Sequence, residues 1–247
     1  MIEVARGDGI ARLTLGDGKR ANALGSDDWA RLVAIADELG ADDSLRVVVV
    51  SGSGRSPFSS GSDMREWIDA TPEDVDSSFH LMEQACEAIE RLPVPVIASV
   101  RGVAAGAGCQ LACACDLRIV GERAKIGMPI ARWGILVSPA FAARLVVLAG
   151  PDTARELLYT GRLLTGPEAV GRGLATRCVP ERDLERVTDE FAAMIAAQPA
   201  AAIRAAKRAV EATLAPTRLA VSAQQATKSA DYAGLRQQVE RFLRGPA

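Results

Sequence analysis

Hydrophobic and polar residues follow two different periods along this chain, and the change of period separates predicted strands from predicted helices. Residues 2–15 form two short alternating stretches split by Gly7-Asp8-Gly9, which predicts a β-hairpin. Val47 to Ser51 is an unbroken valine-rich run, typical of a parallel strand buried on both faces. Residues 95–100 and 117–120 are similarly apolar, and each is predicted to be a strand.

Helical periodicity fills the segments between these strands. It predicts a helix over residues 26–39, with Ser26 as its N-cap and Gly40 as its stop. The further predicted elements are a helix opened by Thr71-Pro72-Glu73 and reaching Glu90, a helix over 107–114, mainly helices from about Pro139, a short strand over 175–179, and an alanine-rich helical region after Pro199. Strands that alternate with helices in this way indicate an α/β fold with a mostly parallel sheet.

A glycine-rich turn runs from Arg101 into the helix predicted at 107–114. Gly102, Gly106 and Gly108 allow the backbone to approach a ligand closely, because glycine has no side chain. The first turn of the helix would present unpaired N–H groups and the positive end of a dipole. Such a place can hold a phosphate, or an oxygen that becomes negative during a reaction.

Charge is unevenly distributed within a net charge of −2, since residues 201–247 hold eight basic and three acidic residues. This region is either a solvated helical surface, or a tail that helps to hold an anionic ligand or packs on an acidic neighbour. Its basic residues alternate with alanines and lack nearby aromatic residues, so we expect no nucleic-acid partner. No apolar run approaches the roughly 20 residues that span a bilayer, and no leader pattern opens the chain, so we expect a cytoplasmic protein without a membrane partner.

The five cysteines do not suggest a disulfide framework in a chain of this kind. Cys109, Cys113 and Cys115 cluster, but zinc would need a fourth ligand, and the only histidine, His80, lies in a different predicted element. We therefore expect no metal site, and we interpret the cysteines as small buried residues.

Four segments resemble, in order, motifs of the crotonase (enoyl-CoA hydratase/isomerase) superfamily. They are KRANAL (19–24), VVVVSGSGRSPFSSGSDM (47–64), PVPVIASVRGVAAGAGCQLACACDLRI (93–119) and LLYTGRLLTGPEAVGRGLATRCV (157–179). The resemblance implies an α/β spiral of repeated ββα units with a C-terminal helical region, assembled as a homotrimer or a dimer of trimers. It also implies two regions, a spiral core with an acyl-CoA site over 1–195 and helices over 196–247 that serve oligomerisation and cover the coenzyme.

The same resemblance implies a coenzyme A thioester as substrate or ligand, with no tightly bound cofactor. The backbone N–H groups of Ser62 and Ala107 would polarise the thioester carbonyl as an oxyanion hole. Alanine replaces the family's glycine at position 107, but it keeps the N–H, so the hole survives where the backbone angles suit alanine.

Residues that the resemblance places near coenzyme A are found in the first three motifs and in the basic C-terminal region. They are Arg20, Ala21, Ala23, Ser60, Ser62, Asp63, Met64, Gly106 and Lys207. Asp63 is also of the residue type that caps a following helix. Asp116 matches a position that we interpret as structural, closing the end of a strand.

The chain departs from the family at the catalytic positions. Hydratases of this family carry two glutamates, and the matching positions here hold Gln110 and Ile130. Neither side chain can accept a proton at neutral pH, so two-glutamate hydration is not expected. Ser138 stands where dehalogenase-like members have an aspartate, and it could bind a substrate hydroxyl.

An alternative base is suggested by the helix that precedes the glycine turn. His80, Glu83 and Glu87 lie about one turn apart on this helix, and Glu83 is the first candidate. The alternative is an exposed acidic face without chemistry. Arg132, in the segment where relatives enclose the acyl group, could stabilise an enolate or bind a carboxylate, or it could be a surface or subunit-contact residue.

Two functions of different classes remain open. The chain is an acyl-CoA enzyme of fatty acid metabolism, of lyase or isomerase type, that stabilises a thioester enolate with its acid–base group moved off the hydratase positions. Alternatively it is a catalytically silent fatty acyl-CoA binding protein on the same scaffold. An acidic side chain near the acyl group favours the enzyme, whereas an apolar pocket around Gln110, Ile130 and Ser138 favours the binding protein.

Overall fold

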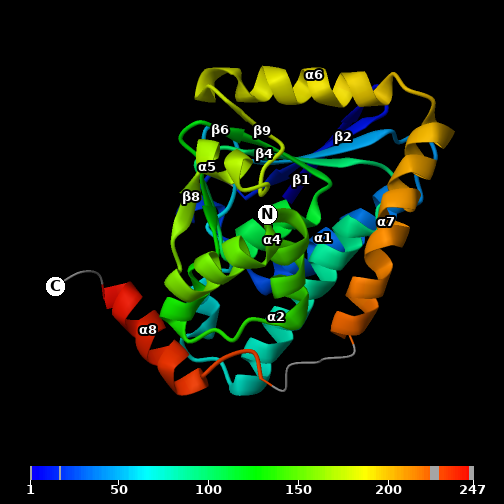
Figure 1. Cartoon of the computed structure of the whole chain (residues 1–247). Helices are drawn as coiled ribbons and strands as arrows, with labels where there is room; N and C mark the ends of the chain where they lie inside the picture. Colours follow the sequence, from blue (N-terminus) through cyan, green and yellow to red (C-terminus); the bar gives the residue numbers. More distant parts are fainter. Residues whose placement is uncertain (1, 17, 223–227, 245–247) are drawn as a thin grey trace.

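The structure, a computed structural model, describes residues 2–16, 18–222 and 228–244 (Figure 1). Its strands are β1 (Ile2–Gly7), β2 (Ile10–Leu15), β3 (Val47–Gly52), β4 (Val96–Val100), β5 (Val103–Ala105), β6 (Leu117–Gly121), β7 (Lys125–Gly127), β8 (Leu163–Thr165) and β9 (Arg177–Val179). Its α-helices are α1 (Ser26–Gly40), α2 (Pro72–Glu90), α3 (Ala107–Ala114), α4 (Pro139–Thr160), α5 (Gly166–Gly171), α6 (Leu184–Ala196), α7 (Ala200–Ser222) and α8 (Tyr232–Arg244). Short 3₁₀ helices are η1 (Arg20–Asn22), η2 (Met64–Trp67), η3 (Pro129–Trp133) and η4 (Glu181–Asp183). The predicted α/β fold is confirmed.

The main sheet has the strand order β1-β2-β3-β4-β6-β9. β1 and β2 pair antiparallel through a turn that joins Gly7 to Ile10, which confirms the predicted hairpin. The other pairs are parallel. The valine run lies at the centre of this sheet as β3, as its composition predicted.

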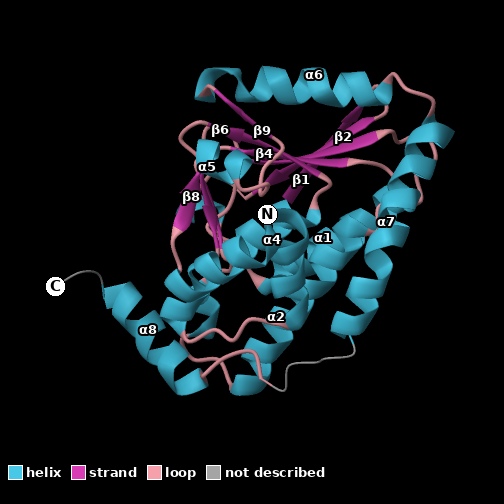
Figure 2. Ribbon diagram, viewed as in Figure 1, coloured by secondary structure: helices cyan, strands magenta, loops and turns pink. Residues whose placement is uncertain are grey.

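Helices cover both faces of the main sheet. Alternate residues of a strand point to opposite faces, so an apolar strand such as β3 needs packing partners on both. Val48 and Val50 of β3 pack in the larger core, together with α1, α2 and α3. Val47 and Val49 pack in a second apolar cluster with Leu184 of α6. Figure 2 shows α6 lying across one face of the sheet. The site described below lies in the larger core.

A second sheet, of order β5-β7-β8, was not predicted from the sequence. Each of its strands has three residues, which is too short for an alternating pattern to be recognised. β5 and β7 pair parallel, whereas β7 and β8 pair antiparallel. This sheet fixes the glycine-rich turn, because β5 leads directly into α3.

The predicted helix starts are partly corrected. Ser26 is not the N-cap of α1, because Gly25 holds that position and the Ser26 hydroxyl donates to Glu66 at 3.0 Å. Thr71 does cap α2, since its hydroxyl accepts a hydrogen bond from the amide of Asp74.

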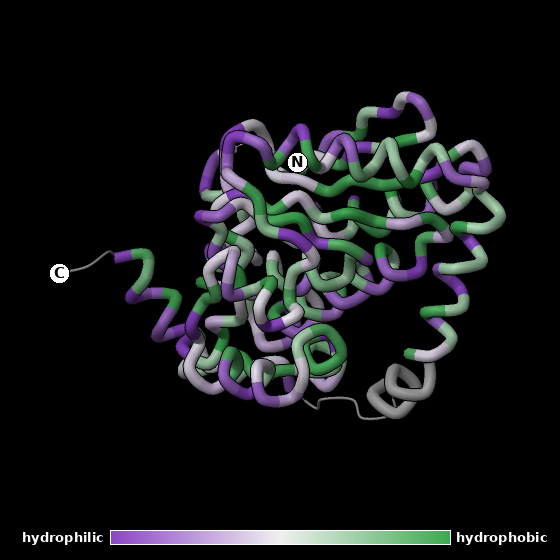
Figure 3. Tube along the Cα trace, turned by 45° about the horizontal axis from the view of Figure 1, so that its top comes forward, coloured by the Kyte–Doolittle hydropathy of each residue, from purple (hydrophilic) through white to green (hydrophobic). Residues whose placement is uncertain are grey.

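The C-terminal segment that includes α8 packs on the region that follows the second motif. Ala230, Leu235 and Val239 share an apolar cluster with Trp67 and Val75. In Figure 3, α8 alternates hydrophilic and hydrophobic residues, as expected of a helix with one packed face. The predicted helical region after Pro199 is confirmed as α7, and the division of the chain at residue 195 stays a prediction.

Candidate active site

The second motif and the glycine-rich turn run side by side in the structure. The amide of Ser59 donates to the carbonyl of Val103 at 3.0 Å, and the amide of Ala105 donates back to the carbonyl of Ser59 at 3.1 Å. This short parallel ladder brings Gly61 next to the start of α3. Two segments that are far apart in the sequence therefore form one continuous backbone surface.

Gly61 is the point of closest approach between these segments. A Cβ atom at this position would lie 2.7 Å from the carbonyl oxygen of Ala105 and 3.1 Å from the amide nitrogen of Ala107. Its φ of +103° is also one that side chains disfavour. The position requires glycine on both grounds, and glycine is what brings the amides of Ser62 and Ala107 together.

The amides of Ser62 and Ala107 are available for a ligand. Among the described residues, no hydrogen bond engages either N–H group. Ala107 is the first residue of α3, so its N–H lies at the positive end of the helix dipole. Gly106 takes the positive φ of +54° at the N-cap, and this leaves alanine unstrained at position 107. The replacement of glycine by alanine in this motif is thus compatible with the local backbone.

The residues predicted to contact coenzyme A gather along this surface. The amide of Ser60 donates to Ala21 at 2.9 Å, and the hydroxyl of Ser60 donates to the carbonyl of Arg20 at 3.2 Å. Leu24 donates to Gly61 at 2.8 Å, which fixes the segment around Ala23 on the other side. The residues of η1 adopt left-handed angles, including φ of +52° at both Arg20 and Ala21. This turn holds the first motif against the second.

Asp63 fixes two arginines at the same surface. Its carboxylate accepts from the amide of Arg65 and pairs with the guanidinium groups of Arg65 at 2.8 Å and of Arg20 at 3.0 Å. The predicted capping role of Asp63 is confirmed. Both arginine side chains remain about half exposed, with 53% for Arg20 and 43% for Arg65. Met64 packs inward against the cluster of Trp67.

Gln110 lies on α3, about one turn after Ala107, and is fully buried. Its amide nitrogen donates to the carbonyl of Phe141 at 3.3 Å and lies 3.5 Å from the sulfur of Met128. Its amide oxygen accepts from Arg144 at 3.5 Å. Both ends of the glutamine are therefore occupied by the protein.

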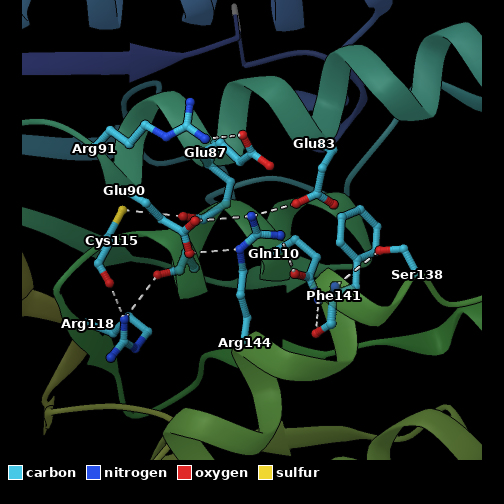
Figure 4. A network of polar contacts seen from close by, with 12 residues as sticks. Glu83, Glu87, Glu90, Arg91, Gln110, Cys115, Arg118, Ser138, Phe141 and Arg144 are labelled. Carbon is cyan, nitrogen blue, oxygen red and sulfur yellow. Dashed lines mark hydrogen bonds and ion pairs between the residues drawn. The ribbon is translucent and has the colours of Figure 1, made fainter. Parts of the chain in front are cut away.

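Arg144 of α4 is the centre of a buried ion cluster that sequence reasoning missed (Figure 4). Its Nη2 lies 2.7 Å from Oε1 of Glu83, and its Nε lies 2.9 Å from Oε1 of Glu90. The hydrogen-bonding capacity of the guanidinium is thus divided between two carboxylates of α2 and Gln110 of α3. The spacing of Glu90, seven residues after Glu83, could have indicated the shared helix face, but Arg144 stands in an apolar run that gave no such signal.

Glu83 is the more exposed of the two carboxylates in this cluster, with 19% of its side chain exposed against 11% for Glu90. The helix that carries it passes beside the second motif, since the sulfur of Met82 on α2 lies 3.9 Å from the hydroxyl of Ser62. Burial raises the pKa of Glu83, while the charge of Arg144 acts in the opposite direction. A carboxyl with a raised pKa suits proton transfer near neutral pH better than an exposed one does.

The expected grouping of three titratable side chains on α2 is corrected. The ring of His80 lies 3.0 Å from Gln84, and Glu87 pairs with Arg91 at 2.7 Å, with 40% of its side chain exposed. Of these three side chains, only Glu83 pairs with Arg144. His80 and Glu87 find their partners along α2 itself, at Gln84 and Arg91.

The remaining predicted positions have identifiable contacts within the fold. Ile130 is buried in η3, and Ser138 is the N-cap of α4, where its hydroxyl accepts from Phe141 at 3.1 Å. Arg132 is exposed and donates to the carbonyl of Gly161 at 2.9 Å. None of these contacts involves a proton-transferring partner in the described part of the chain.

Lys207 forms an internal ion pair with Asp116 at 2.8 Å and donates to the carbonyl of Val94 at 3.0 Å. Its side chain is only 8% exposed. Asp116 also accepts from the amide of Val96 at 2.7 Å, which supports its interpretation as a structural residue at the start of β4. An approach of Lys207 to a coenzyme phosphate would require this pair to separate.

A cavity of about 450 Å³ lies beside η2, between the start of α2 and α8. It is lined by Trp67, Ala70, Pro72, Val75, Tyr232, Ala233, Leu235 and Arg236. Both polar and apolar atoms line it, and η2 follows directly after the second motif.

Metal and membrane features were searched over the described ranges. In residues 2–16, 18–222 and 228–244 no group of three or more His, Cys, Asp or Glu side chains is placed to hold a metal ion. Cys109 and Cys113 lie 4.0 Å apart, sulfur to sulfur, and are buried with Cys115. Within the same ranges, no helix is both long and apolar enough to cross a membrane.

Comparison with known proteins extends the likeness over the whole chain. The family described as Enoyl-CoA hydratase/isomerase matches residues 5–241. YngF of Bacillus subtilis, which carries the name of an enoyl-CoA hydratase/isomerase, is 34% identical over 210 residues, covering 85% of this chain and 81% of YngF. An enoyl-CoA hydratase/isomerase structure from Xanthobacter autotrophicus Py2 has a TM-score of 0.84 at 28% identity, covering 100% of this chain and 98% of that chain. An enoyl-CoA hydratase/carnithine racemase structure from Magnetospirillum magneticum has a TM-score of 0.83 at 29% identity, covering 98% and 87%.

Proposed function

Because the chain belongs to the enoyl-CoA hydratase/isomerase family, we propose that it binds an acyl-CoA thioester and stabilises the enolate of the acyl group. The observation that carries this proposal is the pair of unengaged amides, of Ser62 and Ala107, that Gly61 brings together at the start of α3. Two donors fixed in this way match an oxygen that gains negative charge, and one such donor contributes about 3–4 kcal/mol in related sites.

Glu83 is the proposed base. Its carboxylate takes a proton from the carbon next to the thioester, the C–H bond breaks, and its electron pair moves to the thioester oxygen. The amides of Ser62 and Ala107 hold the resulting oxyanion. Return of the proton from Glu83 to carbon completes an exchange or an isomerisation without any further reactant. The partly buried carboxylate of Glu83, on the helix whose Met82 contacts Ser62, supports this assignment.

Ordinary hydration is not part of the proposal. Gln110 is held at both ends by Phe141, Met128 and Arg144, and Ile130 has no polar group. The site therefore lacks the two carboxylates that hydratases use as acid and base when they add water across a double bond. The proposed reaction class is isomerisation, decarboxylation or elimination through an enolate.

Coenzyme A is proposed to lie along the surface where the first and second motifs meet. Arg20, Ala21, Ala23, Ser60, Asp63, Met64 and Gly106 form this surface. The half-exposed guanidinium groups of Arg20 and Arg65 supply positive charge for the coenzyme phosphates. The ion pair of Lys207 with Asp116 removes that lysine from the proposed contacts. Assembly as a homotrimer or a dimer of trimers stays a proposal, which mass photometry would test.

A second candidate is a silent acyl-CoA binding protein. The observation that favours it is the loss of both family carboxylates, at Gln110 and Ile130, from an otherwise intact scaffold. In this case the two amides would anchor the thioester carbonyl, and Glu83 would serve only the ion cluster. Binding without proton exchange distinguishes this candidate from the enzyme.

The test is hydrogen exchange at carbon. We would incubate butyryl-CoA and a 3-enoyl-CoA with the protein in D₂O and follow deuterium uptake and double-bond position by mass spectrometry and NMR. The proposal predicts uptake next to the thioester that Glu83→Gln reduces at least about 100-fold. Glu87→Gln, one turn further along α2 and paired with the exposed Arg91, is the matched control. At a pH well above the pKa of Glu83, where the like charge of Glu87 no longer changes the ionised fraction, it should exchange at the unmodified rate. Binding of both ligands without uptake would favour the silent protein.

A further inference from the structure

Arg144 is buried between three helices, and its contacts are unusually specific for a structural ion pair. Its side chain is only 8% exposed, and its guanidinium carbon lies 5.9 Å from the ring centre of Phe141. Nε and Nη2 donate to the two oxygens of Glu90 at 2.9 and 3.2 Å. Nη2 also donates to Glu83, whereas Nη1 faces Gln110 (Figure 4). All three guanidinium nitrogens thus donate to side chains of α2 or α3.

Glu83 is held by one oxygen only. Among the described residues, every hydrogen bond to its carboxylate uses Oε1, and the donor is Nη2 of Arg144. Glu90, by contrast, is bound through both oxygens. One oxygen of Glu83 is thereby fixed, and the other is left for a different partner.

Gln110 fixes the direction of Arg144 in turn. Its amide nitrogen is committed to Phe141 and Met128, so only its oxygen is turned toward the guanidinium. A glutamate at this position would add a third carboxylate around one arginine. The neutral glutamine leaves the cluster with two carboxylates and one cation, which a buried site tolerates better.

We propose that Arg144 is a positioning residue for Glu83. Because Gln110 stands where the family has a glutamate, this arginine pairs with Glu83 rather than with a carboxylate at position 110. The proposal rests on the proposed function, in which Glu83 is the base. Arg144 itself touches neither the substrate nor the reacting atoms. It holds one carboxylate oxygen so that the other receives the proton, and it keeps the carboxylate ionised despite burial.

The charged groups around Glu83 predict opposite effects for two substitutions. Arg144 of α4 is the cation that faces it, whereas Glu87 and Glu90 of α2 are like charges, and Gln110 of α3 is neutral. Burial raises the pKa of Glu83, Arg144 lowers it, and the two glutamates raise it. Removal of Glu90 therefore lowers the pKa of Glu83, and removal of the Arg144 charge raises it. A purely structural role of Arg144 predicts no loss of plateau rate in Arg144→Lys, which keeps the charge but not the fork.

The experiment is the pH profile of deuterium exchange into butyryl-CoA. Exchange needs ionised Glu83, so the rate falls as the pH drops through the pKa of this group. We expect Glu90→Gln to move this acid limb to lower pH, by less than the opposite shift in Arg144→Met, because Arg144 is the larger influence on Glu83. Arg144→Met should move it to higher pH by about one unit or more, and Arg144→Lys should restore part of the rate. Titration of ¹³C-labelled glutamate by NMR, with Glu83→Gln identifying the resonance, measures the same shifts without turnover.

The outcomes separate this proposal from the proposed function. An acid limb moved to higher pH and a lower plateau rate in Arg144→Met, both partly restored in Arg144→Lys, support the positioning role. Should Arg144→Met fail to fold, Arg144→Lys decides: it keeps the cation but loses the fork, so a lower plateau rate supports the role. An unchanged acid limb and plateau rate in both Arg144 variants, with exchange still abolished by Glu83→Gln, overturns the positioning role but leaves Glu83 as the base. No exchange in the unmodified protein overturns the proposed function itself.

Discussion

Gly61→Ala tests the oxyanion hole through a single methyl group. The added Cβ would lie 2.7 Å from the carbonyl oxygen of Ala105 and 3.1 Å from the amide nitrogen of Ala107, so the two segments must move apart. Its φ of +103° adds backbone strain of about 1–3 kcal/mol. Separation of the segments turns one amide away from the thioester oxygen. Loss of one such donor corresponds to about 10²–10³ in rate.

The assay is deuterium exchange into butyryl-CoA, with the affinity for butyryl-CoA measured in parallel by calorimetry. We expect the exchange rate to fall about 100-fold or more, while the dissociation constant changes only a few-fold. Affinity is largely retained because the hydrogen bonds that Ser60 donates to Arg20 and Ala21, which hold the proposed coenzyme surface together, do not involve Gly61. The carbonyl is held more tightly in the enolate than in the thioester, so the loss falls mainly on rate.

Gly54→Ala is the matched control. Gly54 also has a positive φ, of +55°, but a Cβ there meets no atom within 4 Å. Alanine there therefore carries left-handed backbone strain without separating any segments. We expect this variant to lose stability and to keep the exchange rate. If Gly61→Ala folds and exchanges at the unmodified rate, the two amides do not stabilise the enolate.

Three further predictions concern the scaffold of the site. Ser138→Ala removes the N-cap of α4 and should lower the free energy of unfolding by about 1 kcal/mol in urea denaturation; no change would argue against the cap. Lys207→Met leaves the partly buried Asp116 without its cation and should lower stability by about 3 kcal/mol, whereas a loss below 1 kcal/mol would indicate a solvated pair. Tyr232→Phe removes the hydrogen bond to Asp76 at 2.7 Å, so amide exchange in α8 should accelerate about tenfold. Burial acts to raise the pKa of Asp76, but hydrogen bonds from Ser229 and Tyr232 outweigh it and hold the pKa below its ordinary value. This contribution is therefore present above the ordinary value and is lost as the pH falls through the lowered pKa. Protection of the α8 amides, taken relative to the intrinsic exchange rate at each pH, should fall in strong acid; equal protection there and at pH 7 would contradict it.

Local sequence patterns predicted the part of the fold that depends on local order. The hairpin around Gly7-Asp8-Gly9 and the buried run of β3 appear as predicted, because period and turn chemistry act over a few residues. The three-residue strands β5, β7 and β8 were not predicted, since their pairing is decided by segments distant in the chain. The N-cap of α1 was misplaced by one residue because Ser26 and Gly25 are both acceptable at that position.

In the candidate site, too, features set by local sequence could be predicted and features set by tertiary contacts could not. Ser62 and Ala107 could be found from motifs, because backbone amides need only a glycine pattern and a helix start. Arg144 could not, because its partners Glu83 and Glu90 lie on another helix and its own neighbours are apolar. A buried ion pair between distant segments can be recognised only from the folded structure, which brings the opposite charges together. The role of Glu87 was undecided for the same reason, since the pairing of side chains on α2 depends on what packs against each face.

The most direct test of the central claim is the vibrational frequency of the bound thioester carbonyl. Butyryl-CoA labelled with ¹³C at the carbonyl would be bound to the protein and compared with free ligand by infrared difference spectroscopy. Donation from the amides of Ser62 and Ala107 predicts a shift to lower frequency on binding, which Gly61→Ala reduces and Gly54→Ala leaves unchanged. A bound carbonyl that absorbs at the frequency of the free thioester would show that these amides do not hold it, and would contradict the account.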